Sequence, residues 1–171
     1  MLSSRYLLIP FAAQMLCMTV DEFHFHWRRK LPRWERIGHP LDTLTVLACL
    51  YWVLLAPPAP ASVAVYVGLS VFSCLFVTKD EWVHAKTCAA GEHWLHAMLF
   101  ALHPLILICA GLLWPARYAG GASALAGWIR YEGFENTFLV INAALTTLFA
   151  LYQFVYWNLL WKPGSKARST T

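Results

Sequence analysis

The sequence predicts an all-α protein, an integral membrane helical bundle of about five transmembrane helices, with a four-helix core plus one. Hydrophobic residues make up 59% of the 171 residues and charged residues only 13%, whereas a soluble domain has about a quarter of its residues charged. The apolar residues also lie in long runs, which favours a membrane protein over a soluble protein with a large core. The basic residues lie mostly between these runs, so we do not interpret the net charge of +4 as a sign of nucleic-acid binding.

Five apolar segments are expected to be the transmembrane helices, at residues 4–21, 41–57, 61–78, 94–115 and 134–161. The second and third are joined by Pro57-Pro58-Ala59-Pro60, which cannot continue a helix. Residues 116–133 are expected to form an outer loop. The segments predict a single transmembrane domain over residues 1–161, followed by a disordered cytoplasmic tail at 162–171.

The distribution of Lys and Arg predicts the orientation. One side of the membrane would carry ten of these residues and the other only three, so the richer side is expected to be cytoplasmic. This places the N-terminus outside and the C-terminus in the cytoplasm, in a protein that we expect in a bacterial inner membrane. The ten are Arg28, Arg29, Lys30, Arg33, Arg36, Lys79, Lys86, Lys162, Lys166 and Arg168, and the three are Arg5, Arg117 and Arg130.

The histidines gather at one level of this topology. All seven lie between residues 24 and 103, and six of them are expected at the cytoplasmic end together with several acids. Ionisable groups at membrane depth are costly, so such a concentration indicates function. The candidate metal ligands are Glu22, His24, His26, His39, Asp42, Glu81, His84, Glu92, His93, His96 and His103.

Helical spacing places several candidates on common faces. Glu92, His96 and His103 fall within roughly 40° of one another around a helix, with His93 at the margin. Three further pairs are three or four residues apart, which again predicts a shared face. These are Glu22 with His26, Glu81 with His84, and His39 with Asp42, where Pro40 is expected to begin the second helix.

Simpler roles compete with metal binding at some positions. His39 alone is explained equally by helix capping, and His103 by a hydrogen bond to a neighbouring helix. Glu35, within the basic stretch 28–36, is expected in a solvated loop that faces lipid headgroups. Among the five cysteines, Cys88 is the one that lies near histidines, and we weigh it as a ligand of zinc or copper.

Imidazoles and carboxylates together suit iron, zinc, copper or manganese. Helical bundles that bind two iron ions use Glu-x-x-His pairs that point inward, and we therefore expect two iron ions. Zinc, copper and haem are the alternatives. Haem would use two histidines as axial ligands and leave the acids without a role.

The segment Glu92-His93-Trp94-Leu95-His96, with His84 and the pair His24 and His26, resembles the membrane-bound di-iron hydroxylases and desaturases of lipids. That family favours HxxxH and HxxHH boxes, and this chain has neither a histidine doublet nor an HxxxH box. Glu81-Trp82-Val83-His84 is similar to half of a ferritin-type di-iron motif. Asp80, His84 and His96 are similar to the copper ligands in the C subunit of particulate methane monooxygenase.

The resemblance implies a di-iron oxidoreductase of the hydroxylase, desaturase or oxidase type. It would act on a lipid or other apolar substrate that enters from the bilayer, at the cytoplasmic face. The sequence has no Gly-rich nucleotide fingerprint, so electrons would come from a separate donor protein. The alternatives are a zinc-dependent membrane lipid hydrolase and a non-enzymatic membrane protein that binds copper, haem or another metal.

Overall fold

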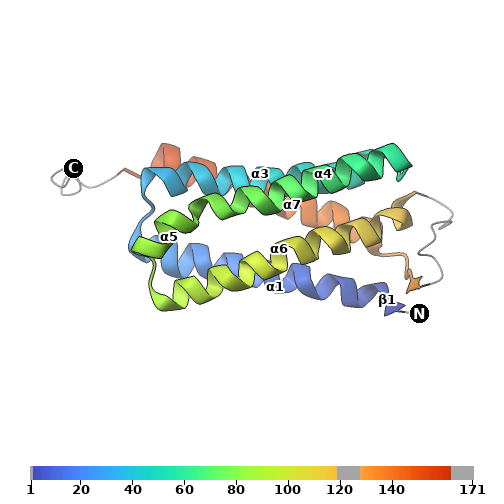
Figure 1. The fold of residues 1–171 in the computed structure, drawn as a ribbon, viewed down its shortest axis with the longest axis horizontal. Helices are drawn as coiled ribbons and strands as arrows, with labels where there is room; N and C mark the ends of the chain where they lie inside the picture. Colours follow the sequence, from blue (N-terminus) through green and yellow to red (C-terminus); the bar gives the residue numbers. More distant parts are fainter. Residues whose placement is uncertain (1, 119–127, 163–171) are drawn as a thin grey trace.

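A computed structural model of the chain describes residues 2–118 and 128–162 and confirms the all-α class (Figure 1). The predicted tail beyond Lys162, and residues 119–127 of the predicted outer loop, lie outside the described residues. The elements are β1 Leu2–Ser3, the 3₁₀-helix η1 Ser4–Leu8, α1 Ile9–Val20, the π-helix η2 Asp21–His26, α2 Trp27–Arg29, α3 Arg33–Leu55, α4 Pro60–Phe76, the 3₁₀-helix η3 Val77–Asp80, α5 Glu81–Thr87, α6 Ala90–Arg117, β2 Ile129–Arg130, α7 Glu135–Phe154 and the π-helix η4 Val155–Leu160.

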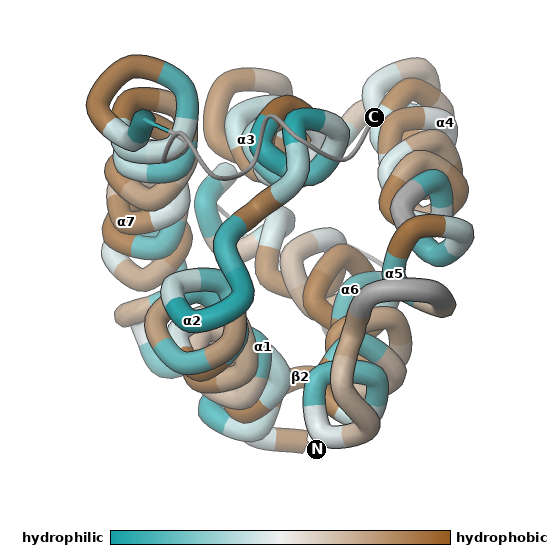
Figure 2. Tube along the Cα trace, turned by 90° about the vertical axis from the view of Figure 1, so that its left-hand side faces the viewer, coloured by the Kyte–Doolittle hydropathy of each residue, from teal (hydrophilic) through white to brown (hydrophobic). Residues whose placement is uncertain are grey.

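The long helices form two layers (Figure 2). Helix α3 packs between α7 and α4 in one layer, and α1 packs against α6 in the other. Helix α6 also contacts α3, α4 and α7, so it joins the layers. The short elements η2, α2 and α5 all lie at the same end of the bundle, opposite β1 (Figure 1).

Four helices of the described residues are long and apolar enough to cross a membrane: Arg33–Leu55, Pro60–Ala85, Ala90–Arg117 and Glu135–Leu160. They turn many large apolar side chains outward, among them Leu75, Ile108 and Leu148, each more than half exposed. Helix α1 is the fifth helix. It has 12 residues and is about 18 Å long at the usual helical rise, so it reaches the roughly 30 Å thickness of a hydrocarbon core only together with its flanking turns.

Proline residues set the start of α3 and shape its first turns. Pro32 holds the extended N-cap position, and the helix therefore begins at Arg33. The prediction that Pro40 begins this helix is wrong, because Pro40 lies inside it. Pro40 has no N–H to give to the carbonyl of Arg36 four residues earlier. The side-chain amide of Asn158 donates to that carbonyl instead, at 2.9 Å, and thereby ties η4 to α3.

The π-helix η2 continues α1 and changes which residues share a face. Hydrogen bonds in a π-helix run from residue i to residue i+5, so side chains four and five positions apart come together. Asp21, Glu22 and His26 are all buried as a result, while Phe23 and His24 between them are exposed. This local change of helix type presents three ionisable groups to the interior of the bundle.

The half of the bundle away from η2 is filled by apolar residues. Leu50, Val53, Leu113 and Leu139 are almost completely buried there. At the outermost end β1 pairs in parallel with β2, with Leu2 opposite Ile129. The core therefore fixes α1, α3, α6 and α7 relative to one another and positions the polar end described next.

Candidate metal centre

Four imidazoles from four different elements meet at the polar end of the bundle. His26 comes from η2, His39 from α3, His84 from α5 and His96 from α6. The ring centres of His26 and His39 are 4.7 Å apart, and those of His84 and His96 are 4.2 Å apart. Between these two pairs the ring centres are 6.0 and 6.5 Å apart. The centre is thus two close pairs of imidazoles side by side.

The carboxylate of Asp21 joins the two pairs. Its Oδ2 lies 3.1 Å from Nε2 of His26, and its Oδ1 lies 3.1 Å from Nε2 of His96. Ligand atoms that bind one ion at about 2.0–2.2 Å and at a right angle to each other lie about 3 Å apart. The contact between Asp21 and His96 is a hydrogen bond in this structure. The same 3.1 Å spacing, found at each oxygen of Asp21, also fits an oxygen and an imidazole nitrogen that bind one ion.

Among the nitrogen atoms of these rings, Nε2 of His39 and Nδ1 of His96 are buried without a hydrogen-bonding partner in the described residues. Buried polar atoms are almost always hydrogen-bonded, so each such atom needs an explanation. Both are lone-pair donors of the kind that transition metals prefer. These two nitrogen atoms without hydrogen-bonding partners, together with the imidazole and carboxylate groups around them, fit a site for a metal ion.

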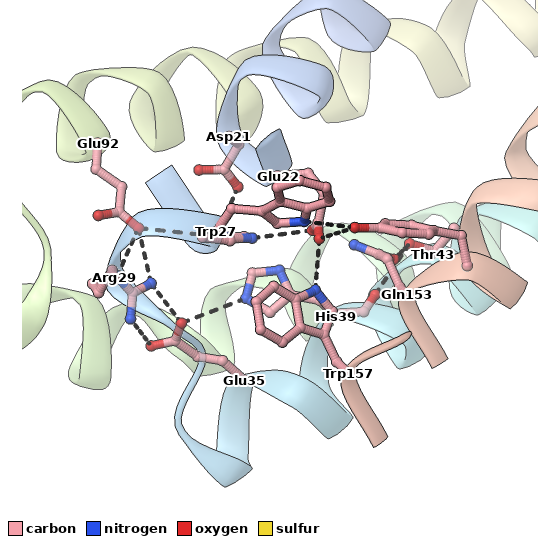
Figure 3. A network of polar contacts seen from close by, with 12 residues as sticks. Asp21, Glu22, Trp27, Arg29, Glu35, His39, Thr43, Glu92, Gln153 and Trp157 are labelled. Carbon is pink, nitrogen blue, oxygen red and sulfur yellow. Dashed lines mark hydrogen bonds and ion pairs between the residues drawn. The ribbon is translucent and has the colours of Figure 1, made fainter. Parts of the chain in front are cut away.

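Glu22 holds His26 in place. Its Oε2 lies 3.2 Å from Nδ1 of His26. Its other oxygen accepts hydrogen bonds from the indole N–H of Trp157 at 2.6 Å and from the hydroxyl of Tyr152 at 3.0 Å, as Figure 3 shows for Trp157. Carboxylates that contact the second nitrogen of a ligating histidine fix its ring orientation and tautomer. Glu22 is placed to do this for His26.

Arg29 compensates two further buried carboxylates (Figure 3). Its guanidinium donates to both oxygens of Glu35, at 2.6 and 3.2 Å, and to Oε1 of Glu92, at 2.8 and 3.1 Å. Burial alone would lower the pKa of Arg29, but the hydrogen bonds with the two carboxylates raise it above its ordinary value. Asp21 and Glu22 are buried at the same end of the bundle and do not contact Arg29 in any hydrogen bond or ion pair of the described residues. Four buried carboxylates near one guanidinium favour the binding of cations.

His26 itself is charged when no metal is bound. Burial by itself lowers the pKa of His26, yet the adjacent carboxylates of Asp21 and Glu22 raise it to about 9. The imidazole therefore carries a second proton at neutral pH. Because ligating histidines must be neutral, an ion bound here takes the place of that proton.

Three overlapping groups of side chains in the described residues bring their ligand atoms within 4.8 Å of one another and can hold a metal ion. The first is Asp21 with His26, Glu92 and His96, and all four side chains are buried. The second is His26 with Glu35 and His39, and the third is His84 with Cys88 and His96. His26 and His96 each belong to two groups, so the three groups form one continuous centre.

The structure brings together six of the eleven residues predicted from the sequence, namely Glu22, His26, His39, His84, Glu92 and His96. The other five lie outside the centre. His24 is exposed beside Arg28, Glu81 is exposed, and His93 is half-buried without a place in any of the three groups. Asp42 pairs with Lys79 at 2.6 Å. His103 is buried deeper and lies 2.9 Å from the hydroxyl of Ser73, which matches the hydrogen-bonding alternative.

Asp21 and Glu35 belong to the centre but were not among the predicted ligands. Asp21 reaches the centre because it lies in the π-helix η2, which could not be predicted from the sequence. Glu35 was expected in a solvated loop, and this prediction is wrong, because Glu35 is completely buried against Arg29. The four-residue spacing from Glu35 to His39 was the available signal. The side chain of Asp80, which the copper resemblance used, lies outside the described part of the chain.

A cavity of about 330 Å³ lies next to the centre. Asp21, Glu22, His39, His84 and His96 form its polar end. The rest is lined largely by apolar residues of α1, α3, α6 and α7, including Phe11, Met18, Val46, Leu99, Ile106 and Phe149. Two lining residues, Met15 on α1 and Leu145 on α7, are almost half exposed on the outside of the bundle. The cavity therefore opens sideways between α1 and α7.

Comparisons with protein-family models, with curated proteins and with solved structures find no significant match, so the geometry above carries the functional argument alone.

Proposed function

We propose that this chain is an integral membrane metalloenzyme that holds two transition-metal ions and oxidises an apolar substrate such as a lipid chain. The metal that we propose is iron. The observation that carries the proposal is the double pair of imidazoles, joined by Asp21, at the polar end of an apolar cavity. Two iron ions would supply redox chemistry with dioxygen that amino-acid side chains lack.

The ligand set supports two ions better than one. His26 and His39 form one pair and His84 and His96 the other, and each pair has its own oxygen of Asp21 within 3.1 Å of one member. Glu35 lies beside the first pair, and Glu92 completes the buried group around Asp21. This mixture of imidazole and carboxylate ligands is typical of iron held in helical bundles.

The protein's own contribution is positioning. Glu22, anchored by Trp157 and Tyr152, orients the ring of His26. The cavity walls hold an extended apolar chain and exclude water, and the opening between α1 and α7 admits the chain from the side. The polar end of the cavity then directs one carbon toward the imidazole pairs, which supplies the proximity that catalysis requires.

The polar end of the bundle carries many basic residues. Among them are Arg28, Lys30 and Arg33, which are exposed. The positive-inside rule favours the cytoplasmic side of a bacterial inner membrane for this end. Electrons for the reaction would come from a separate donor protein on that side, because the sequence has no nucleotide-binding fingerprint.

A second candidate function rests on Cys88. With His84 and His96 it forms a group of one thiol and two imidazoles, a set that suits zinc or copper better than iron. A single zinc ion there would fit a hydrolase of membrane lipids, and a single copper ion would fit a carrier.

Metal analysis separates these functions. Protein purified without a polyhistidine tag should contain two iron ions per chain and absorb visible light. The variants His39→Ala and His84→Ala each remove one member of a different pair, so each should lose at least half of the iron. His24→Ala and His93→Ala are matched controls outside the centre and should retain it. One colourless zinc ion per chain, lost in Cys88→Ser, would refute the oxidoreductase in favour of the zinc protein.

A further inference from the structure

The apolar part of the cavity contains two amide side chains that the metal centre does not use. Gln14 on α1 and Asn142 on α7 both line it, and both are more than nine-tenths buried. Amides in such surroundings are costly unless they are hydrogen-bonded. Their place in the cavity therefore points to a polar group on whatever binds there.

Gln14 is the more informative of the two. Its carbonyl oxygen Oε1 is buried and has no hydrogen-bonding partner among the described residues. Its amide nitrogen has only a weak contact, with the sulfur of Met18 at 4.0 Å. Inside a bilayer no bulk water reaches such a group. The oxygen is thus an acceptor that lacks its donor.

The other uncharged polar side chains of the described cavity lining already have hydrogen-bonding partners. His103 lies 2.9 Å from the hydroxyl of Ser73, which lies 2.7 Å from the hydroxyl of Thr45. This chain of contacts belongs to the packing of α3, α4 and α6. The hydroxyl of Thr43 donates to the amide oxygen of Gln153, and the hydroxyls of Thr19 and Thr146 donate to backbone carbonyls of their own helices. Among the described lining residues this leaves the side-chain amides of Gln14 and Asn142 to recognise a ligand.

The charge of the cavity restricts the ligand. No lysine or arginine lines the described part of the cavity, and its polar end carries Asp21, Glu22 and Asp42. A carboxylate or phosphate headgroup would have no counter-charge and would meet three acids. The ligand's polar group is therefore not an anion.

We infer that Gln14 and Asn142 form a hydroxyl-binding station and that the substrate is a neutral lipid alcohol. A hydroxyl group donates one hydrogen bond and accepts others, so it can donate to Gln14 and accept from the amide of Asn142. Gln14 lies seven residues before Asp21, which places the station about 10 Å from the imidazole pairs along α1. The substrate would thus present a carbon about 10 Å from its hydroxyl to the centre. This last step rests on the proposed function, whereas the binding of the alcohol does not.

A binding assay on metal-free protein tests the station. Protein in lipid nanodiscs is titrated with tritium-labelled 1-tetradecanol, and unlabelled tetradecane and tetradecanoate compete for the site. The alcohol should bind at least about tenfold more tightly than either competitor, the effect expected of one or two buried hydrogen bonds. Equal affinity for the alcohol and the alkane would overturn the inference without any variant.

Variants then locate the station. Gln14→Leu and Asn142→Leu should each lose about tenfold in affinity for 1-tetradecanol, while Asn136→Leu, an exposed amide on the same helix α7, should bind like the unmodified protein. Unchanged binding in both cavity variants refutes the station. Iron content is measured on metal-loaded samples of the same preparations. Retained iron with no preference for the alcohol refutes the station alone, and alcohol binding without retained metal refutes the metal centre alone.

Discussion

Replacing Arg29 by methionine should strongly destabilise the protein, because Arg29 is the cation between two buried carboxylates. Glu35 is completely buried and Glu92 is 1% exposed. Each accepts two hydrogen bonds from the guanidinium, at distances between 2.6 and 3.2 Å. Methionine keeps most of the side-chain volume and removes the charge, so the variant leaves both carboxylates without their partner.

The magnitude follows from the burial of the three groups. Removing one partner of a buried ion pair costs about 3–5 kcal/mol, mostly because the other charge stays buried and unpaired. The Arg29 side chain is 18% exposed, which allows water to reach the vacated space. We therefore expect the lower end of the range, about 3 kcal/mol, in the free energy of unfolding. The neighbouring Arg28 is exposed and contacts only His24 among the described side chains, so Arg28→Met should change it by no more than about 0.5 kcal/mol.

Reversible unfolding in mixed micelles of sodium dodecyl sulfate and a mild detergent, followed by circular dichroism, measures the difference. Both variants are compared with the unmodified protein, each without metal, so that metal binding does not contribute. A loss in Arg29→Met no larger than that in Arg28→Met would show that Glu35 and Glu92 do not depend on this guanidinium. The description of the centre as carboxylates held by Arg29 would then be wrong.

Three further predictions test other parts of the structure. Glu22→Gln weakens the hydrogen-bond acceptor that orients the His26 imidazole, so metal affinity measured by chelator competition should fall about 10–100-fold. An unchanged affinity would show that Glu22 does not belong to the centre. Ser73→Ala removes the hydrogen-bonding partner of the buried His103 imidazole, so the free energy of unfolding in detergent should fall by about 1–3 kcal/mol while the metal content stays unchanged. A parallel loss of metal would show that His103 belongs to the centre. Gly111→Ala places a methyl group 3.1 Å from the ring of Tyr66, whose hydroxyl is fixed by a 2.5 Å hydrogen bond, and should destabilise by about 1–3 kcal/mol. Gly68→Ala meets nothing within 4 Å and should be neutral or stabilising by up to about 1 kcal/mol, and equal effects of the two changes would contradict this account of the packing.

The sequence was sufficient where a regular helix connects the residues. Glu92, His96 and His103 were predicted on one face of a helix, and the structure buries all three. Glu22 and His26 were predicted to share a face, and their side chains lie 3.2 Å apart. The first prediction needed only the period of the α-helix. The second holds although both residues lie in the π-helix η2, because a spacing of four residues also gives a shared face there.

The rest of the centre depends on features that helical periodicity does not contain. Asp21 and His26 are five residues apart, a spacing that separates them on an α-helix and joins them only on the π-helix. Glu35 reaches the interior because Arg29, from a different element, supplies its counter-charge. A single sequence shows neither the change of helix type nor the pairing between elements, so the solvated loop was the natural but wrong expectation for Glu35.

The short pairing of β1 with β2 has a consequence for biosynthesis. Leu2 and Ser3 leave the ribosome before their partners Ile129 and Arg130, which follow 127 positions later. At the usual 5–20 residues per second, the N-terminal strand waits roughly 6–25 s for its partner. The imidazole of His26 waits for those of α5 and α6 in the same way. Loading of the proposed metal ions would therefore follow the insertion of α6, because a truncated chain that ends before this helix lacks Glu92 and His96.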